Sequence, residues 1–77
     1  MKNHYEWFMD KCKVFDDNMR FSSYVENVCK CLIYLDYNCS VLDAIKDTYT
    51  SIDYIKEFYL RKESIYNCSI ELGYSCG

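Results

Sequence analysis

Six cysteines are the residues of this 77-residue chain with the widest chemistry, because a thiol can bind zinc, form a disulfide or act as a nucleophile. Four of them are the first and last residues of two similar segments, Cys31–Cys39 and Cys68–Cys76. Both segments read Cys-x-Ile-x-Leu-x-Tyr-x-Cys, and the second begins 37 residues (68 − 31) after the first. The other two cysteines are Cys12 and Cys29.

Zinc binding is the first chemistry that the cysteines suggest. Cys29 and Cys31 are separated by one residue, whereas zinc ligands in a tight pair usually have about two to four residues between them. Cys68 and Cys76 are too far apart to supply a second such pair, and His4 is the only histidine. We therefore predict no metal site and no cofactor. The weak candidates for ligands are Cys29, Cys31, Cys68 and Cys76.

Disulfide formation is the second chemistry. The number of cysteines is even, and Cys39 is a conceivable partner for Cys68 or Cys76. The chain does not open with the apolar run of a signal peptide, because Glu6 and Asp10 interrupt it. We expect a cytoplasmic, reducing location with mostly free, buried thiols. A secreted, disulfide-bonded helical effector is an alternative that oxidised cysteines would favour.

Catalytic constellations are not evident in the sequence. A cysteine nucleophile needs a neighbouring base, and the single histidine lies close to a chain end. Asp16 and Asp17 are adjacent and would point to different faces of a helix, which is poor geometry for shared acid–base work. Gly-rich phosphate loops and serine-nucleophile motifs are also missing. We predict that the protein is not an enzyme.

Charge and composition narrow the classes of partner. The formal net charge is −3, which does not favour binding to a phosphate backbone, and we do not expect direct nucleic-acid binding. No run of about 20 apolar residues suggests a membrane span. Aromatic residues reach 18%, with nine tyrosines, and large amphipathic rings suit a small core or an interaction surface. The oligomeric state is left open.

An acidic, tyrosine-rich stretch in the middle of the chain is the candidate binding surface. Carboxylates suit a basic groove, and tyrosine is a frequent anchor in protein interfaces. A solvated face is the competing interpretation. The short, acidic, aromatic-rich profile looks like that of small phage or mobile-element proteins that block a host nucleic-acid enzyme. We predict an inhibitor or adaptor that binds a basic protein surface, with these contact residues: Asp36, Tyr37, Asp43, Asp47, Tyr49, Asp53 and Tyr54.

A small zinc-binding or helix-turn-helix regulator is the alternative function. The outline of a helix-turn-helix is present in the middle of the chain: a helix over residues 40–47, a turn at 48–51 and a second helix over residues 52–62. The last segment, 52–62, carries a nearly neutral mixture with an acidic first turn: Asp53, Lys56, Glu57, Arg61 and Lys62. A helix that reads DNA normally presents Arg, Lys, Asn or Gln there. We therefore rank this alternative below the interaction module.

The elements that must position these residues are expected to be helices, because the chain has no proline and several N-cap signals. Asn3 with Glu6 predicts a helix over residues 3–19. Three capping boxes, beginning at Ser23, Ser40 and Thr50, predict three more helices. The predicted fold class is all-α, a single domain over residues 1–77 that forms a small bundle of about four helices.

The second predicted helix is expected to be the most buried, because its own apolar residues are distributed around most of its circumference. Leu32 and Leu35 are predicted core positions, and Val41, Ala44, Ile45 and Thr48 are the predicted buried side of the third helix. Residues 64–77 are left open between an extension of the fourth helix, a strand-like segment and an extended tail. The 37-residue offset also fits a duplicated helical hairpin, and chance similarity in a biased composition fits equally well.

Overall fold

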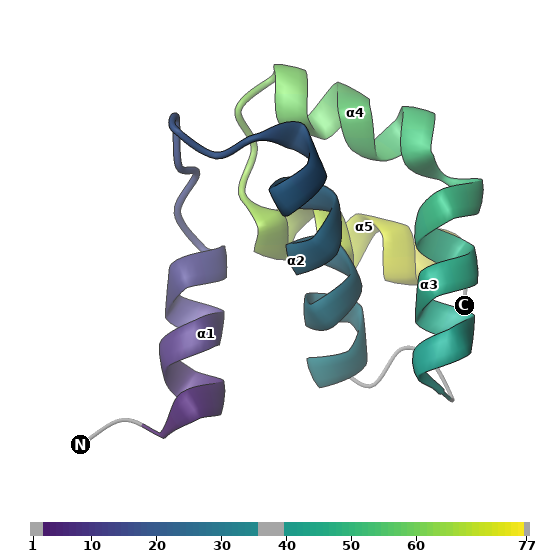
Figure 1. Cartoon of the computed structure of the whole chain (residues 1–77), viewed down its shortest axis with the longest axis horizontal. Helices are drawn as coiled ribbons and strands as arrows, with labels where there is room; N and C mark the ends of the chain where they lie inside the picture. Colours follow the sequence, from purple (N-terminus) through teal and green to yellow (C-terminus); the bar gives the residue numbers. More distant parts are fainter. Residues whose placement is uncertain (1–2, 36–39, 77) are drawn as a thin grey trace.

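The structure is a computed structural model that describes the backbone of residues 3–35 and 40–76 and the side chains of residues 3–35 and 40–73 (Figure 1). The described residues form five helices and no strand, which confirms the all-α bundle. The segment left open by the sequence forms a helix of its own. The helices are α1 (His4–Cys12), α2 (Phe21–Tyr34), α3 (Val41–Thr50), α4 (Ile52–Leu60) and α5 (Ile65–Cys76).

Two predicted helix starts are confirmed by their caps. The Asn3 side chain accepts a hydrogen bond from the Glu6 backbone N–H at 2.8 Å. The Ser40 hydroxyl oxygen accepts one from the Asp43 N–H at 3.2 Å. Each bond satisfies a backbone donor that the first helical turn leaves without a partner.

Other predicted boundaries were wrong by several residues. Helix α1 ends at Cys12 rather than at residue 19, and the Asp16 carboxylate accepts a hydrogen bond from the Asn18 N–H at 2.9 Å. Such local side-chain bonds compete with the helical ladder. Helix α2 begins at Phe21, before the Ser23 capping box, and Phe21 packs its ring 5.3 Å from that of Tyr59. At the start of α2, tertiary packing therefore overrode the local capping signal.

The break between α4 and α5 is a Schellman motif. Lys62 has a left-handed backbone, with φ of 59°. The Glu63 N–H donates to the Phe58 carbonyl at 3.0 Å, and the Lys62 N–H donates to that of Tyr59 at 3.1 Å. Both bonds belong to this motif, which usually has glycine at the left-handed position. The Ser64 hydroxyl then caps the next helix by accepting from the Asn67 N–H at 3.1 Å.

A Lys62→Gly variant is expected to be more stable than the parent by roughly 0.5–1 kcal/mol, because only glycine adopts this backbone without steric cost. The ion pair between Lys62 Nζ and Asp17, at 3.3 Å, is exposed and contributes little. Lys56→Gly, inside α4, is the matched control and should lose about 1 kcal/mol. Urea unfolding measures both changes. Equal destabilisation by the two variants would contradict a strained Lys62.

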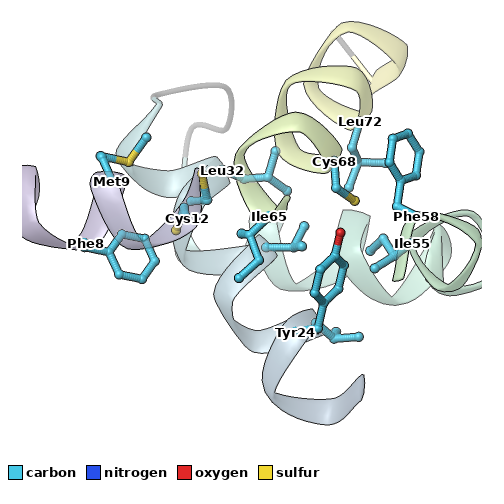
Figure 2. Packing of buried hydrophobic residues seen from close by; sticks show 13 residues of the cluster. Phe8, Met9, Cys12, Tyr24, Leu32, Ile55, Phe58, Ile65, Cys68 and Leu72 are labelled. Atoms are coloured by element: carbon cyan, nitrogen blue, oxygen red, sulfur yellow. The ribbon is translucent and has the colours of Figure 1, made fainter. Parts of the chain in front are cut away.

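The core is centred on α2, as predicted, because α2 contacts all four other helices. In Figure 1, α2 lies between α1 and α3, α4 spans the top of the view, and α5 passes behind α2. Tyr24, Val28 and Leu32 are fully buried on α2, which confirms Leu32 as a core position. Leu35 is half-buried and packs against the same cluster. Figure 2 shows Leu32 and Tyr24 of α2 packed beside Cys68 and Leu72 of α5.

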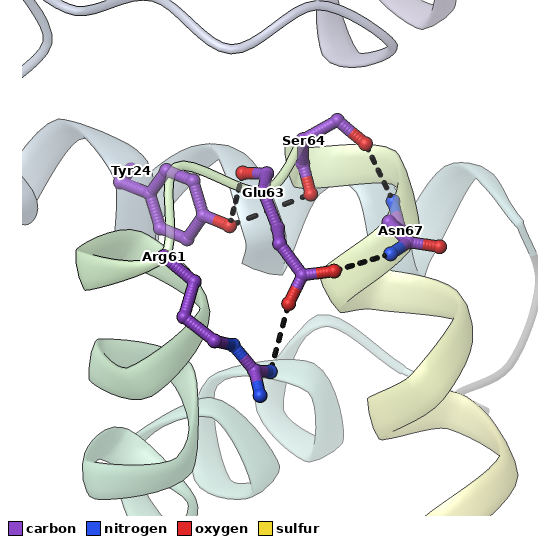
Figure 3. Close-up of polar contacts among 5 residues, drawn as sticks. All are labelled: Tyr24, Arg61, Glu63, Ser64 and Asn67. Atoms are coloured by element: carbon purple, nitrogen blue, oxygen red, sulfur yellow. Dashed lines mark hydrogen bonds and ion pairs between the residues drawn. The ribbon is translucent and has the colours of Figure 1, made fainter.

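Two tyrosine hydroxyls donate hydrogen bonds to backbone carbonyls that lie far away in the sequence, in the segments between helices. Tyr24 donates a hydrogen bond to the Glu63 carbonyl at 2.9 Å, across the α4–α5 turn (Figure 3). The Glu63 carboxylate contacts Arg61 at 2.7 Å and accepts from Asn67 at 2.8 Å. Tyr59 donates to the carbonyl of Met19 at 2.6 Å. The two tyrosine bonds satisfy partly buried hydroxyl groups that burial would otherwise penalise.

The described helices do not repeat as two hairpins. A shift of 37 residues places α1 on residues 41–49, which matches α3. The same shift places α2 on residues 58–71, a range that includes the left-handed turn at Lys62. The helical interpretation nevertheless holds for the described part of both cysteine segments, since Cys31 lies in α2 and Cys68 in α5.

Candidate interaction surface

Helix α3 presents large apolar side chains to solvent. Only Ala44 and Thr48 of this helix are buried, and they face the rest of the molecule. Leu42 is 77% exposed and Tyr49 is 69% exposed, although both are large and apolar in character. Val41 and Ile45 were predicted to be buried, and this was wrong, because both are exposed. We call Val41, Leu42, Ile45 and Tyr49 the α3 apolar face.

An apolar groove runs between this face and α2. Its volume is about 310 Å³, and Val41, Ile45 and Tyr49 form its α3 side. The opposite side comes from α2 and includes Cys29, Lys30 and Ile33. Contiguous exposed apolar surface of this kind commonly marks a site of protein–protein interaction. The signal in the sequence was the presence of Leu42 and Tyr49, which make the apolar stripe wider than one buried helix face requires.

The predicted contact residues are divided between two sides of α3. Tyr49 lines the groove, one turn beyond Ile45. Asp43 and Asp47 stack one turn apart on another side of the helix, outside the groove. Asp43 is exposed and Asp47 is half-buried. The surface around α3 therefore combines an apolar part and an acidic part.

The remaining predicted contact residues lie on α4 or outside the described residues. Asp53 is exposed in the first turn of α4. Tyr54 packs its ring against that of Phe58, with centroids 5.1 Å apart, and keeps part of its surface in solvent. Asp36 and Tyr37 are outside the described residues. The structure thus gathers five of the seven predicted positions around α3 and the start of α4.

The cysteines are distributed between the core and the groove. Cys12, Cys31 and Cys68 are buried free thiols, and Cys29 is a half-buried free thiol. Among the described residues, no three His, Cys, Asp or Glu side chains converge as metal ligands. Cys29 lines the groove, whereas Cys31 and Cys68 lie in the core, so α2 directs its two candidate ligands to different places. Cys39 and the Cys76 side chain are outside the described set.

Ionisation is suppressed at two of the core thiols, Cys12 and Cys68, whereas the hydrogen bond with Cys12 lowers the pKa of the Cys31 thiol. The hydrogen bond between Cys12 and Cys31, together with burial, raises the pKa of the Cys12 thiol. Burial raises the pKa of the Cys68 thiol to about 12, and burial also raises the pKa of the Tyr24 hydroxyl. Since the thiolate is the reactive form, the Cys12 and Cys68 thiols are unreactive at neutral pH.

These raised pKa values predict a loss of stability at alkaline pH. The unfolded chain releases the Cys68 proton near pH 8.5, whereas the folded chain keeps it until about pH 12. The stabilising contribution is therefore fully present below about pH 8.5 and is lost as pH rises, by about 1.4 kcal/mol per pH unit for each such group. Urea midpoints at pH 8 and pH 10.5 measure the loss. Cys68→Ala should reduce this dependence, and a parent midpoint unchanged over that range would contradict it.

The helix-turn-helix outline differs from the predicted one. Residue Ser51 alone joins α3 and α4, so the predicted turn over 48–51 was mostly wrong. The physical reason is that Thr48 is buried and its hydroxyl donates to the Ala44 carbonyl at 2.6 Å, which keeps it in α3. A DNA-binding helix-turn-helix usually has a turn of about three or four residues.

Comparison with protein-family models, curated proteins and solved structures gave no match. No helix formed by the described residues combines the length and the apolar character needed to cross a membrane. The fold defines the class as a small helical bundle, and the surface around α3 is its candidate functional site.

Proposed function

We propose that the protein is a non-enzymatic interaction module, an inhibitor or adaptor, that binds a partner protein through the surface around α3. The observation that carries the proposal is the α3 apolar face, with Leu42 and Tyr49 in solvent beside an apolar groove. Exposing this much apolar surface is unfavourable for an isolated molecule, and a partner that covers it removes that penalty. Tyrosine in such a position is a frequent hot spot of binding.

The acidic side chains around α3 support a partner with a basic surface. Asp43, Asp47 and Asp53 lie on α3 and on the first turn of α4. The chain as a whole is also acidic, with a net charge of −3. Complementary charge accelerates encounter, and apolar contacts then slow dissociation. We propose a cytoplasmic setting, of the kind in which a phage or mobile-element protein would block a host nucleic-acid enzyme.

A double charge reversal tests the electrostatic part of the proposal. With a partner isolated by affinity capture, Asp43→Lys/Asp47→Lys should slow association about tenfold or more at low salt, and the difference should shrink at 0.5 M salt. The matched control is Asp17→Lys/Glu57→Lys, which reverses two exposed carboxylates away from α3. Equal effects of the two double variants would mean that only total charge matters, and the acidic side of α3 would be a solvated face.

A further inference from the structure

A second groove, between α1 and α2, has a different chemistry from the first. Its volume is about 290 Å³, and its lining includes the basic residues Lys11 and Lys30 and the imidazole of His4. None of the described residues that line it is acidic, although the chain has more acidic than basic residues. The acidic residues of α1, Glu6 and Asp10, line other hollows.

An exposed tryptophan forms the aromatic wall of this groove. Trp7 is 55% exposed, and it is the only tryptophan of the chain. Lys11 Nζ lies 5.4 Å from the centre of the Trp7 ring, and the His4 ring stacks on it with centroids 6.1 Å apart. These contacts hold the Lys11 ammonium group and the His4 imidazole beside an apolar surface. Tyr34 closes the α2 side of the groove, where it packs edge-on against Phe8 at 5.0 Å.

We propose that the groove between α1 and α2 is a second binding site, which takes an acidic peptide segment with its carboxylates on Lys11 and Lys30 and its apolar side chains on Trp7. Ammonium groups donate charge-assisted hydrogen bonds to carboxylates, and tryptophan is among the strongest anchors of a peptide. This site adjoins the groove beside α3, because Lys30 and Ile33 of α2 line both grooves.

The observations favour a peptide over a nucleic acid. A single strand is held by bare aromatic platforms and by a track of many basic residues. Here His4 and Lys11 lie against the Trp7 ring, so this half-exposed ring offers apolar surface to a side chain but not a bare platform to a base. The groove also offers only two lysines. The net charge of −3 would repel a long polyanion. A short segment with a few carboxylates can reach both ammonium groups without displacing His4 from the indole.

Fluorescence of Trp7 reports directly on this groove, because no other residue of the chain is a tryptophan. The intact protein would be titrated, at constant ionic strength, with a blocked hexapeptide of four glutamates and two leucines. The expected result is a saturable change in Trp7 emission. The same peptide with glutamines in place of glutamates should bind at least about tenfold more weakly, and Lys11→Glu/Lys30→Glu should weaken binding of the acidic peptide by a similar factor.

Three comparisons make the result decisive. Lys46→Glu/Lys56→Glu changes the net charge equally but lies on α3 and α4, and it should leave the affinity within about twofold of the parent. Equal weakening by both double variants would overturn the site. Saturation by inorganic phosphate or by an oligodeoxythymidine at lower concentration than the peptide would overturn the ligand class. The absence of any emission change, with binding absent by calorimetry as well, would overturn the proposal as a whole.

Discussion

A Leu32→Ala variant is expected to lose about 2–5 kcal/mol of unfolding free energy, because the substitution removes buried methyl groups and leaves a cavity. Leu32 is 1% exposed and sits at the centre of the cluster that joins α2 to α5. A domain of this size is stabilised by only about 5–15 kcal/mol in total. The variant should therefore melt well below the parent or fail to fold. Thermal and urea unfolding, followed by far-UV circular dichroism, measure the change.

Leu42→Ala is the matched control, because it makes the same chemical change at an exposed position of α3. We expect its stability to lie within about 0.5 kcal/mol of the parent. A Leu32→Ala protein that unfolds at the same urea concentration as the Leu42→Ala protein would mean that α2 is not the centre of the core. The comparison also shows whether the exposed Leu42 side chain contributes to folding.

A Leu42→Ala/Tyr49→Ala variant is expected to bind its partner about a hundredfold or more weakly than the parent. Each truncation of a hot-spot residue raises the binding free energy by more than about 1–2 kcal/mol, and tenfold in Kd corresponds to about 1.4 kcal/mol. The loss should appear mainly as faster dissociation, since apolar anchors act after encounter. Surface plasmon resonance with the captured partner measures both rates.

The control for this variant removes exposed apolar groups elsewhere. Val14→Ala/Leu60→Ala truncates two side chains that are as exposed as those on α3 but lie beyond α1 and at the end of α4. Its affinity should match that of the parent within about twofold. Similar losses in the two double variants would show that general stickiness, rather than the α3 apolar face, explains the binding.

The sequence predicted much of the fold because its local signals agree with its packing. The caps at Asn3 and Ser40 mark true helix starts, and the apolar spacing of Tyr24, Val28 and Leu32 correctly identifies the buried side of α2. The end of α4 could not be predicted, because its left-handed turn is built on Lys62 instead of the usual glycine. Helix α5 was equally hidden, since its short apolar run fits a strand or a helix.

The candidate surface was predicted only in part, because periodicity shows which residues share a face but not which face a neighbour covers. Val41 and Ile45 have the spacing of core residues, yet only Ala44 and Thr48 of α3 are buried. The acidic and tyrosine positions were identified from composition, which cannot show that Tyr49 lines the groove and Asp43 lies outside it. The groove beside Trp7 depends on contacts between α1 and α2, and no local pattern encodes these.

Covalent labelling of Cys29 tests most directly whether a partner covers the groove between α2 and α3. Cys29 lines that groove and is half-buried, whereas Cys12, Cys31 and Cys68 are buried. In a Cys39→Ser/Cys76→Ser variant, a small maleimide should therefore label Cys29 first. We predict that bound partner slows this labelling at least about tenfold, with occupancy verified in the same sample. Labelling of Cys29 at the same rate in the free and the fully bound protein would contradict the proposed binding surface.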